Sequence, residues 1–456
     1  MSKLKVETTA QVLALMDQRG SSHLKVGVFD IDGVLRGKYM SRDKLASSLE
    51  KGFGFCNVVL GWDSMDQLYD NGTHTGWHTG YPDANVRLLP QSCRELPLEG
   101  DTLFLLGEFA DDDEVVCPRG CLRRVLKQAD DMGFAVKSGF EYEFFVFEET
   151  PHSAHDKNYQ NLRPLAPGFH GYSTLRNSVH SDVYQGLLEL GEAMDFPLEG
   201  LHEETGPGVL EAAIAVDGAL AAADKAALFK TFAKIFAQKR GLMATFMARW
   251  STEWAGSSGH IHLSLVRADD GSPVFHDPQA AHGMSEFQRH FIGGLQCYMP
   301  ELTAMYAPTV NSYRRLVPGF WAPTDASFGV DNRTCALRLI PGSGTSQRVE
   351  NRVCGADANP YLALAGAVAS GLRGIEERIE PHGPVRGNAY EQKFSKRLAL
   401  PRSLDEAARR LATSKLARQA FGEPFVEYFS ASRDFEAREF AKSVTDWELT
   451  RYFEII

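Results

Sequence analysis

The chain lacks the long apolar runs that mark membrane proteins. None of its 456 residues lies in an apolar stretch of about 18 residues, and residues 1–7 carry no apolar core of a secretory signal. Cysteine is scarce: there are seven, an odd number at irregular spacing, as is typical of reduced thiols. We therefore expect a cytoplasmic protein that has no membrane contact and no disulfide framework.

Basic segments and phosphate-binding loops are also missing. The 48 Lys and Arg residues are outnumbered by 59 Asp and Glu, so the formal net charge is −11, and no Lys/Arg-rich run is present. This balance argues against nucleic acid as a partner. The sequence contains neither Gly-x-x-x-x-Gly-Lys-Ser/Thr nor Gly-x-Gly-x-x-Gly. A nucleotide would therefore have to be held by metal ions and arginines.

The length favours more than one domain, because single compact cores are usually smaller. The first part alternates like β-structure, with a helix expected at 7–20, a hairpin at 26–33, and strands at 57–60 and 102–108. The acidic run 111–114 and Pro118 mark a boundary. We predict a small β-rich domain over residues 1–112 and a larger domain over residues 113–456.

The larger part mixes helical and strand patterns without strict βαβ alternation, which predicts an α+β fold. Residues 149–172, rich in His, Asn, Pro and Gly, are expected to form a long loop. The expected strands are 134–136, 140–148, 208–215, 242–248 and 260–266. The expected helices are 176–193, 218–239, 283–299, 359–377 and 403–420.

The segment 348–352 is the most informative short stretch. If it is extended, Arg348, Glu350 and Arg352 share one face, which places a carboxylate between two guanidiniums. Packing does not require this pattern, whereas binding a cation together with phosphate oxygens does. By itself the segment could equally be a solvated strand face.

Further acids and histidines support a metal site. Glu141 and Glu143 share one face of an otherwise apolar strand, where two like charges are costly unless a cation neutralises them. His260 and His262 share a strand face in the same way. A Gly-Pro-Gly turn can bring two more acids, Glu204 and Glu211, together. A mixed Glu/His site suits Mg²⁺ or Mn²⁺.

Five arginines lie within one short stretch of the chain, which indicates a ligand rich in negative charge. These arginines are Arg315, Arg333, Arg338, Arg348 and Arg352.

In order and spacing, these motifs resemble the glutamine synthetase family. The motifs that carry the resemblance are 139–145, the Glu204–Glu211 turn, 260–265, 311–319, 331–333 and 348–362, and the likeness continues to residue 449. The resemblance implies a small N-terminal β-grasp domain and a C-terminal catalytic domain. It also implies hexameric rings, often stacked as dodecamers, in which neighbouring subunits share active sites.

The resemblance further implies ATP, two Mg²⁺ or Mn²⁺ ions, and a role for each matching residue. Ligands of one ion are Glu143, Glu204 and Glu211, and ligands of the other are Glu141, His260 and Glu350. The nucleotide contacts are His262, Ser264, Arg338 and Arg348, while Arg333 contacts the transferred phosphate. The glutamate contacts are Arg315, Arg352 and Gly256, and Asp70 accepts a proton from the incoming nitrogen.

Departures from the family pattern bear on the substrate. Trp321 stands where ammonia-using members usually carry a Glu, and Ala255 stands where an Asn is usual. The segment around Asp70 is altered as well. Replacing a carboxylate with an indole weakens binding of a small cation and builds an apolar wall. The chain therefore resembles the glutamate–amine ligase branch, which uses glutamate and a small organic amine.

Two alternatives remain open at this point. The chain could be an ordinary ammonia-using glutamine synthetase in which Trp321 only packs beneath its loop. It could also be a non-catalytic structural member of the family. All six metal positions are intact, which disfavours the second alternative.

Overall fold

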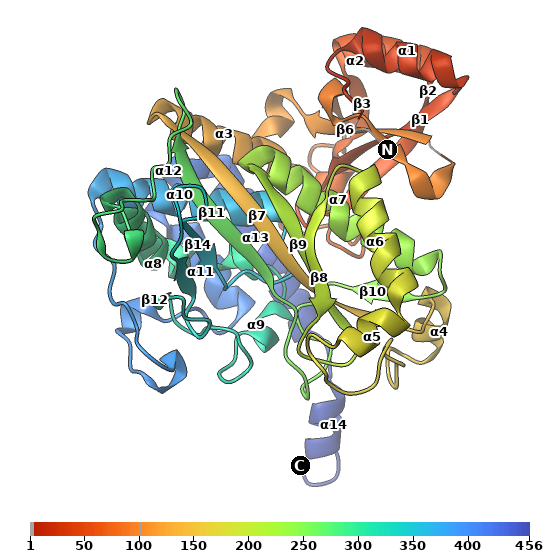
Figure 1. The fold of residues 1–456 in the computed structure, drawn as a ribbon. Helices are drawn as coiled ribbons and strands as arrows, with labels where there is room; N and C mark the ends of the chain where they lie inside the picture. Colours follow the sequence, from red (N-terminus) through yellow and green to blue (C-terminus); the bar gives the residue numbers. More distant parts are fainter. Residues whose placement is uncertain (1–3, 101) are drawn as a thin grey trace.

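The computed structural model describes residues 4–100 and 102–456 and confirms the α+β class. Two β-sheets are covered by helices (Figure 1). In the described part of the chain, every helix is too short or too polar to cross a membrane.

The N-terminal sheet has the order β2-β1-β6-β4-β3, and β5 pairs with β6. Its strands are β1 (His23–Phe29), β2 (Leu35–Ser41), β3 (Phe53–Cys56), β4 (Asp83–Leu88), β5 (Arg94–Leu96) and β6 (Thr102–Phe109). The expected hairpin is β1–β2, and the expected first helix is α1 (Thr9–Arg19), which ends at Gly20 with φ 63°. The strand expected at 57–60 is wrong: this segment is a 3₁₀ turn that follows β3.

The C-terminal sheet has the order β12-β13-β14-β11-β7-β9-β8, and β10 pairs with β7. Its strands are β7 (Phe134–Phe147), β8 (Leu198–Glu203), β9 (Val209–Gly218), β10 (Met243–Thr245), β11 (Gly259–Arg267), β12 (Phe328–Val330), β13 (Leu337–Ile340) and β14 (Arg348–Asn351). The two strands expected at 134–136 and 140–148 form a single strand, β7. It runs through Gly139, where its register with β9 shifts.

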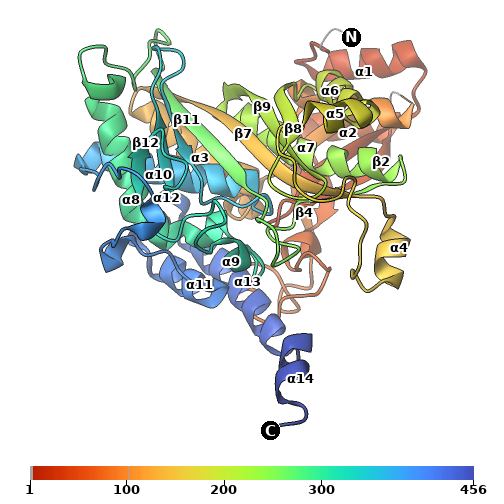
Figure 2. The same ribbon diagram turned by 60° about the horizontal axis from the view of Figure 1, so that its bottom comes forward.

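The helices cover one face of this sheet and its ends (Figure 1). The helices of this part are α3 (Pro118–Asp131), α4 (Pro151–Asp156), α5 (Thr174–Val179), α6 (Ser181–Ala193), α7 (Ala219–Gln238), α8 (Glu286–Tyr306), α9 (Ser312–Arg315), α10 (Pro360–Glu377), α11 (Leu404–Thr413), α12 (Lys415–Phe421) and α13 (Glu423–Ala441). In contrast, α2 (Arg42–Lys51) packs with α1 against the N-terminal sheet, and α14 (Asp446–Tyr452) projects from the body of the protein (Figure 2). The helices expected at 176–193 and 403–420 are each two helices. His180 separates α5 from α6 and Ser414 separates α11 from α12. The expected loop 149–172 contains the short helix α4.

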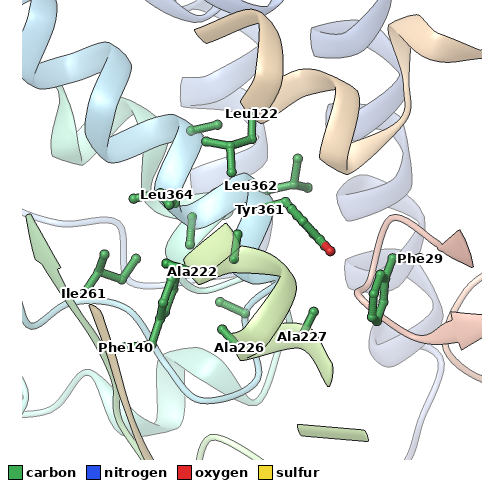
Figure 3. Close-up of a cluster of buried hydrophobic side chains, with 14 of the residues drawn as sticks. Phe29, Leu122, Phe140, Ala222, Ala226, Ala227, Ile261, Tyr361, Leu362 and Leu364 are labelled. Atoms are coloured by element: carbon green, nitrogen blue, oxygen red, sulfur yellow. The ribbon is translucent and has the colours of Figure 1, made fainter. Parts of the chain in front are cut away.

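The hydrophobic core lies between the C-terminal sheet and its helices (Figure 3). Phe140 of β7 and Ile261 of β11 point toward α7 and α10, and both are almost fully buried. Because side chains alternate across a strand, the charged residues next to them face the opposite side. Burial of one face therefore decides where the acids of β7 and the histidines of β11 point.

The same core continues into the N-terminal part. Phe29, at the end of β1, lies 5.6 Å from the ring of Tyr361 on α10 (Figure 3). At the turn that follows, Asp32 pairs with the buried Arg433 of α13 at 2.7 Å. β6 ends at Phe109 and α3 begins at Pro118, so the boundary predicted at residue 112 falls between sheet and helix but stays a prediction.

Candidate active site

A first group of acids and histidines forms where β14, β11 and β7 lie side by side. In the strand register Glu350 faces His262, and Glu141 faces His260. One ligand atom each of Glu141, His262 and Glu350 lies within 4.8 Å of the others, and we call these three residues the inner cluster. His262 Nε2 is 3.0 Å from Glu141 Oε1, and His260 Nδ1 is 3.3 Å from Glu350 Oε1.

A second group lies across β7, β9 and β8. Glu211 faces Glu143 on one side and His202 on the other. His202, Glu204 and Glu211 again bring ligand atoms within 4.8 Å of one another, and we call them the outer cluster. His202 Nε2 is 3.4 Å from Glu211 Oε1. Burial works against protonation of His202, but Glu211 outweighs it and raises the pKa of this imidazole.

A tight turn connects the two acids of the outer cluster, as the sequence predicts. The backbone N–H of Glu204 donates to the carbonyl of Val209 at 3.1 Å. Gly208 has φ 66°, and a Cβ there would lie 2.8 Å from the carbonyl oxygen of Val146. Only glycine fits this position. The turn therefore places Glu204 and Glu211 in contact range.

Neighbouring arginines and histidines keep the two carboxyl groups of the inner cluster ionised. Glu350 is fully buried and accepts from Arg352 Nη1 at 2.5 Å and from Arg338 Nη1 at 3.1 Å. Burial favours the neutral acid, but Arg352 and then His260 outweigh it, so the pKa of Glu350 is lowered to about 2. Burial is likewise outweighed at Glu141, where His262 and His260 hold the pKa well below its ordinary value.

The pKa of Glu143 is shifted in the opposite direction from those of Glu350 and Glu141. Burial, together with the nearby Glu211, raises the pKa of Glu143 to about 7. Its Oε2 accepts a hydrogen bond from the backbone N–H of Ser258 at 2.8 Å. The site therefore contains more negative charge on this side than its own cations neutralise.

Both clusters fit divalent cations. The Nε2 of His260 and the Oε2 of Glu204 are buried and make no hydrogen bond with the described part of the chain, which is unusual for buried polar atoms. Carboxylate oxygens with one or two imidazole nitrogens are donors suited to Mg²⁺ or Mn²⁺. The strand register, however, places His262 and not His260 opposite Glu350. The structure therefore groups His262, expected only as a nucleotide contact, with the metal-type residues.

Two cavities meet at Glu141. A cavity of about 420 Å³ contains the outer cluster and the arginines and is lined by Glu141, Glu143, Tyr172, His202, Glu204, Thr205, Glu211, Ala255, Gly256, Ser258, His260, Phe320, Trp321, Arg333, Arg338, Glu350 and Arg352. We call it the acid cavity. A second cavity of about 250 Å³, the Ser264 cavity, lies on the other side of Glu141 and is lined in part by His262, Ser264 and Arg348.

The arginines divide into three positions. Arg333, Arg338 and Arg352 line the acid cavity, as the sequence predicts for groups that bind anions. Arg348 does not flank Glu350 as expected: its Nε lies 3.1 Å from His262 Nδ1, in the wall of the Ser264 cavity. Arg338, which faces Glu350 from β13, takes the place predicted for Arg348.

Arg315 lies in a different environment from the one predicted. It ends the short helix α9, where the sequence pattern favours a strand, and it is almost fully buried. Its guanidinium donates to the carbonyls of Val353 and Arg352 at 2.8 and 3.0 Å and to Ser258 Oγ at 2.9 Å. The residues lining the acid cavity do not include it. In this structure Arg315 supports the backbone beneath the cavity, so its predicted contact with glutamate has no geometric support.

Trp321 lies on a loop at the rim of the acid cavity. It has φ 59°, an uncommon backbone conformation for a bulky side chain, and 52% of its surface is exposed. Its neighbour Phe320 stacks against Arg249, whose guanidinium carbon is 4.3 Å from the ring centre. The indole therefore does not pack beneath its loop but forms part of the cavity wall.

Gly256 forms another part of this wall. A Cβ at Gly256 would lie 2.3 Å from the carbonyl oxygen of Ala248 and 2.8 Å from Arg315 Cγ. Any larger residue would displace the backbone at this edge of the cavity.

Asp70 pairs with a helix of the C-terminal part and not with either cluster. It lies on the N-terminal segment between β3 and β4 and pairs with Arg438 of α13, whose Nη1 is 3.0 Å from Asp70 Oδ2. The hydrogen bonds from Arg438 lower the pKa of this carboxyl. The residues that line the acid cavity of this chain do not include Asp70.

Five residues of the acid cavity are not predicted from the sequence: Tyr172, His202, Thr205, Ser258 and Phe320. His202 could have been found, because it precedes Glu204 by two residues on one strand face. Tyr172 comes from a long loop with no periodic signal, and its ring covers that of His202 at 4.5 Å. Phe320 adjoins Trp321 and carries no signal of its own.

Comparison with known proteins agrees with this geometry. Residues 115–452 match the family model described as "Glutamine synthetase, catalytic domain". A relative from Dictyostelium discoideum, "Type-1 glutamine synthetase 2", is 44% identical over 442 residues, covering 96% of this chain and 84% of that protein.

A second relative and a solved structure are also similar to this chain, and their names do not contain the words glutamine synthetase. "Glutamate--isopropylamine ligase" from Pseudomonas sp is 36% identical over 463 residues, covering 99% of both chains. A solved structure described as "GmaS/ADP complex-Conformation 1" superposes with a TM-score of 0.83 at 26% identity, covering 97% of this chain and 99% of that one.

Proposed function

The chain belongs to the family of the glutamine synthetase catalytic domain, and on this premise we propose that it is an ATP-dependent ligase. It joins the γ-carboxylate of glutamate to an organic amine through γ-glutamyl phosphate. One observation carries the choice of amine over ammonium: the half-exposed indole of Trp321 in the wall of the acid cavity, which contains the outer cluster together with Glu141 and Glu350.

The inner and outer clusters are the groups that would hold two Mg²⁺ or Mn²⁺ ions. Bound there, the ions would neutralise charge on the transferring phosphoryl group. His262, Ser264 and Arg348 face the Ser264 cavity, the side proposed for ATP.

The arginines of the acid cavity act on the reacting groups. A γ-carboxylate oxygen of glutamate attacks the γ-phosphorus of ATP, and ADP leaves. Arg333 and Arg338 donate to the phosphoryl oxygens, where preorganised donors are most effective. Arg352 lies beside them, within reach of a glutamate carboxylate.

The second step needs a neutral amine. The amine nitrogen attacks the acyl carbon, the C–O bond to phosphate breaks, and one proton must leave the nitrogen. We propose that Asp70 of a neighbouring subunit accepts this proton. This assignment requires an oligomer, because Asp70 lies outside the acid cavity of its own chain, and we propose a ring-shaped homo-hexamer or dodecamer. We further propose that the enzyme is cytoplasmic, which its seven unpaired cysteines support.

Trp321 suits an amine with a carbon body. An indole offers an apolar surface and a cation–π face worth roughly 0.5–2 kcal/mol, but it offers no base. Ammonium has no hydrocarbon part to bury against such a wall. The structure therefore favours an organic amine as the second substrate.

Ordinary glutamine synthesis from ammonium is the second candidate, because the 44% identical relative carries that name. A non-catalytic role is disfavoured, because both clusters and the cavity arginines are in place.

The deciding experiment measures glutamate-dependent phosphate release with ammonium and with a panel of alkylamines, polyamines, ethanolamine and anilines. We expect at least one amine to give a higher kcat/KM than ammonium, with the γ-glutamyl amide identified by mass spectrometry. If ammonium exceeds every amine of a broad panel, the enzyme is a glutamine synthetase and Trp321 is only structural.

A further inference from the structure

His202 lies in the acid cavity beside residues of metal type, yet the family resemblance gives it no role. It sits on β8, directly across from Glu211 of β9. Together with Glu204 and Glu211 it forms the outer cluster, in which one ligand atom from each residue lies within 4.8 Å of the others. Glu143, the third ligand expected here, is absent from that group.

Glu143 and Glu204 differ in whether the protein already provides hydrogen-bond partners for their carboxylate oxygens. Glu143 faces Glu211 from the opposite side, and one of its oxygens accepts the backbone N–H of Ser258 at 2.8 Å. That oxygen is already satisfied by the protein. In contrast, the buried Oε2 of Glu204 has no hydrogen-bond partner in the described part of the chain, and it lies 3.8 Å from His202 Nδ1.

The orientation of the imidazole adds a second argument. His202 Nδ1 lies 3.3 Å from the carbonyl oxygen of Glu203, which can only accept, so this nitrogen carries a hydrogen. In the neutral ring Nε2 then presents a lone pair to Glu211 Oε1 at 3.4 Å. Either a proton on Nε2 or a cation bound between the two atoms satisfies both lone pairs, and a divalent ion would take the place of that proton. A backbone carbonyl that orients a histidine through Nδ1–H is the usual support of an imidazole that binds metal through Nε2.

Tyr172 covers the face of this ring, with centroids 4.5 Å apart and an angle of 33°. The stack limits rotation of the imidazole and shields one side of it from water. His202 is thereby held with Nε2 toward the acids.

We infer that His202 binds the divalent ion of the outer cluster through Nε2, together with Glu204 and Glu211. This inference rests on the metal requirement of the proposed function and does not depend on which amine is used. A nitrogen donor favours Mn²⁺ over Mg²⁺, because Mg²⁺ prefers oxygen ligands. The outer cluster should therefore discriminate between the two ions.

The test is direct metal titration, with no turnover involved. Free Mn²⁺ is followed by EPR during titration of the full-length protein, and Mg²⁺ is then used as a competitor. His202→Gln should weaken one class of Mn²⁺ sites by roughly 10- to 100-fold and should lower the Mn²⁺/Mg²⁺ preference of that class. The matched control is His155→Gln on α4, a histidine whose side chain is 79% exposed. The control should titrate like the wild type.

A variant at the other cluster separates the two sites. Glu350→Gln should weaken the other class of Mn²⁺ sites, and the Mn²⁺ that remains bound should still show nitrogen coupling by pulsed EPR. This measurement leaves His202 intact, so it applies even if His202→Gln does not fold.

Three results would overturn the inference. The first is a His202→Gln titration that matches His155→Gln. The second is equal weakening of both Mn²⁺ classes in folded His202→Gln. The third is the absence of nitrogen coupling in Glu350→Gln. A failure of the amine panel with normal metal titrations would instead refute only the proposed substrate.

Discussion

The floor and the rim of the acid cavity are built differently. The floor is sheet: Glu350 is fully buried, His260 is 4% exposed, and both are positioned by strand register. The rim is loop: Trp321 is 52% exposed, and it lies with Phe320 on the segment between α9 and β12. Phosphoryl transfer needs groups that do not move. The residues proposed to select the amine lie on loops, so they can change without disturbing the phosphoryl-transfer groups on the sheet.

The largest effect is expected at the floor. Glu350→Ala should reduce glutamate-dependent phosphate release on the order of 10³-fold or more, because it removes a metal-type carboxylate that also pairs with the buried Arg352. Circular dichroism should show that the protein remains folded, and Glu350→Gln serves as the isosteric control. Wild-type activity in the purified variant would sink the two-metal interpretation of β14.

Asp70 should matter nearly as much, although it does not line the acid cavity of its own chain. Asp70→Asn should lower turnover roughly 10²- to 10⁴-fold, the usual contribution of a general base, while ATP binding stays normal. Mixing Asp70→Asn subunits with Glu350→Gln subunits should restore part of the activity, because some shared sites then receive both wild-type groups. An active monomer in light scattering, or no recovery after subunit exchange, would contradict shared sites.

Residues at the rim should affect the preference between amine and ammonium more than they affect the rate of phosphoryl transfer. Trp321→Glu should shift kcat/KM toward ammonium, and Trp321→Ala should weaken the preferred amine by about 2- to 30-fold, the equivalent of a cation–π contact. The control is Trp447→Ala on α14, which projects from the body of the protein (Figure 2). Equal losses for all amines and for ammonium would show that the indole only supports its loop.

The smallest expected effect is the pH dependence of metal affinity. Glu143 has a pKa raised to about 7, so it is protonated below pH 7 in the metal-free protein and must lose that proton when a cation binds nearby. Metal affinity should therefore fall by up to about tenfold per pH unit below 7 and level off above it. Calorimetry in buffers of different ionisation enthalpy measures the released proton. Glu143→Gln should release one proton fewer, and an unchanged profile would exclude this carboxyl as the source.

Strong local signals predicted many elements correctly. The Asp-Gly turn predicts the β1–β2 hairpin, and the apolar stripe near 218–239 predicts α7. The errors occur where local patterns compete. Residues 57–60 are apolar enough for a strand but follow β3 as a 3₁₀ turn. The single strand β7 runs through Gly139, which the sequence pattern treats as a break.

By itself the sequence determined the family, the α+β class and the kinds of residue at the site, because ordered motifs and alternating acids and histidines are local properties. It could not determine which of these residues meet. Strand register decided that His262 faces Glu350 and that His202 faces Glu211. Helix packing decided that Arg315 is buried beneath the cavity. Such pairings join segments up to about a hundred residues apart, and a shift of one residue would turn every side chain of a strand to the other face.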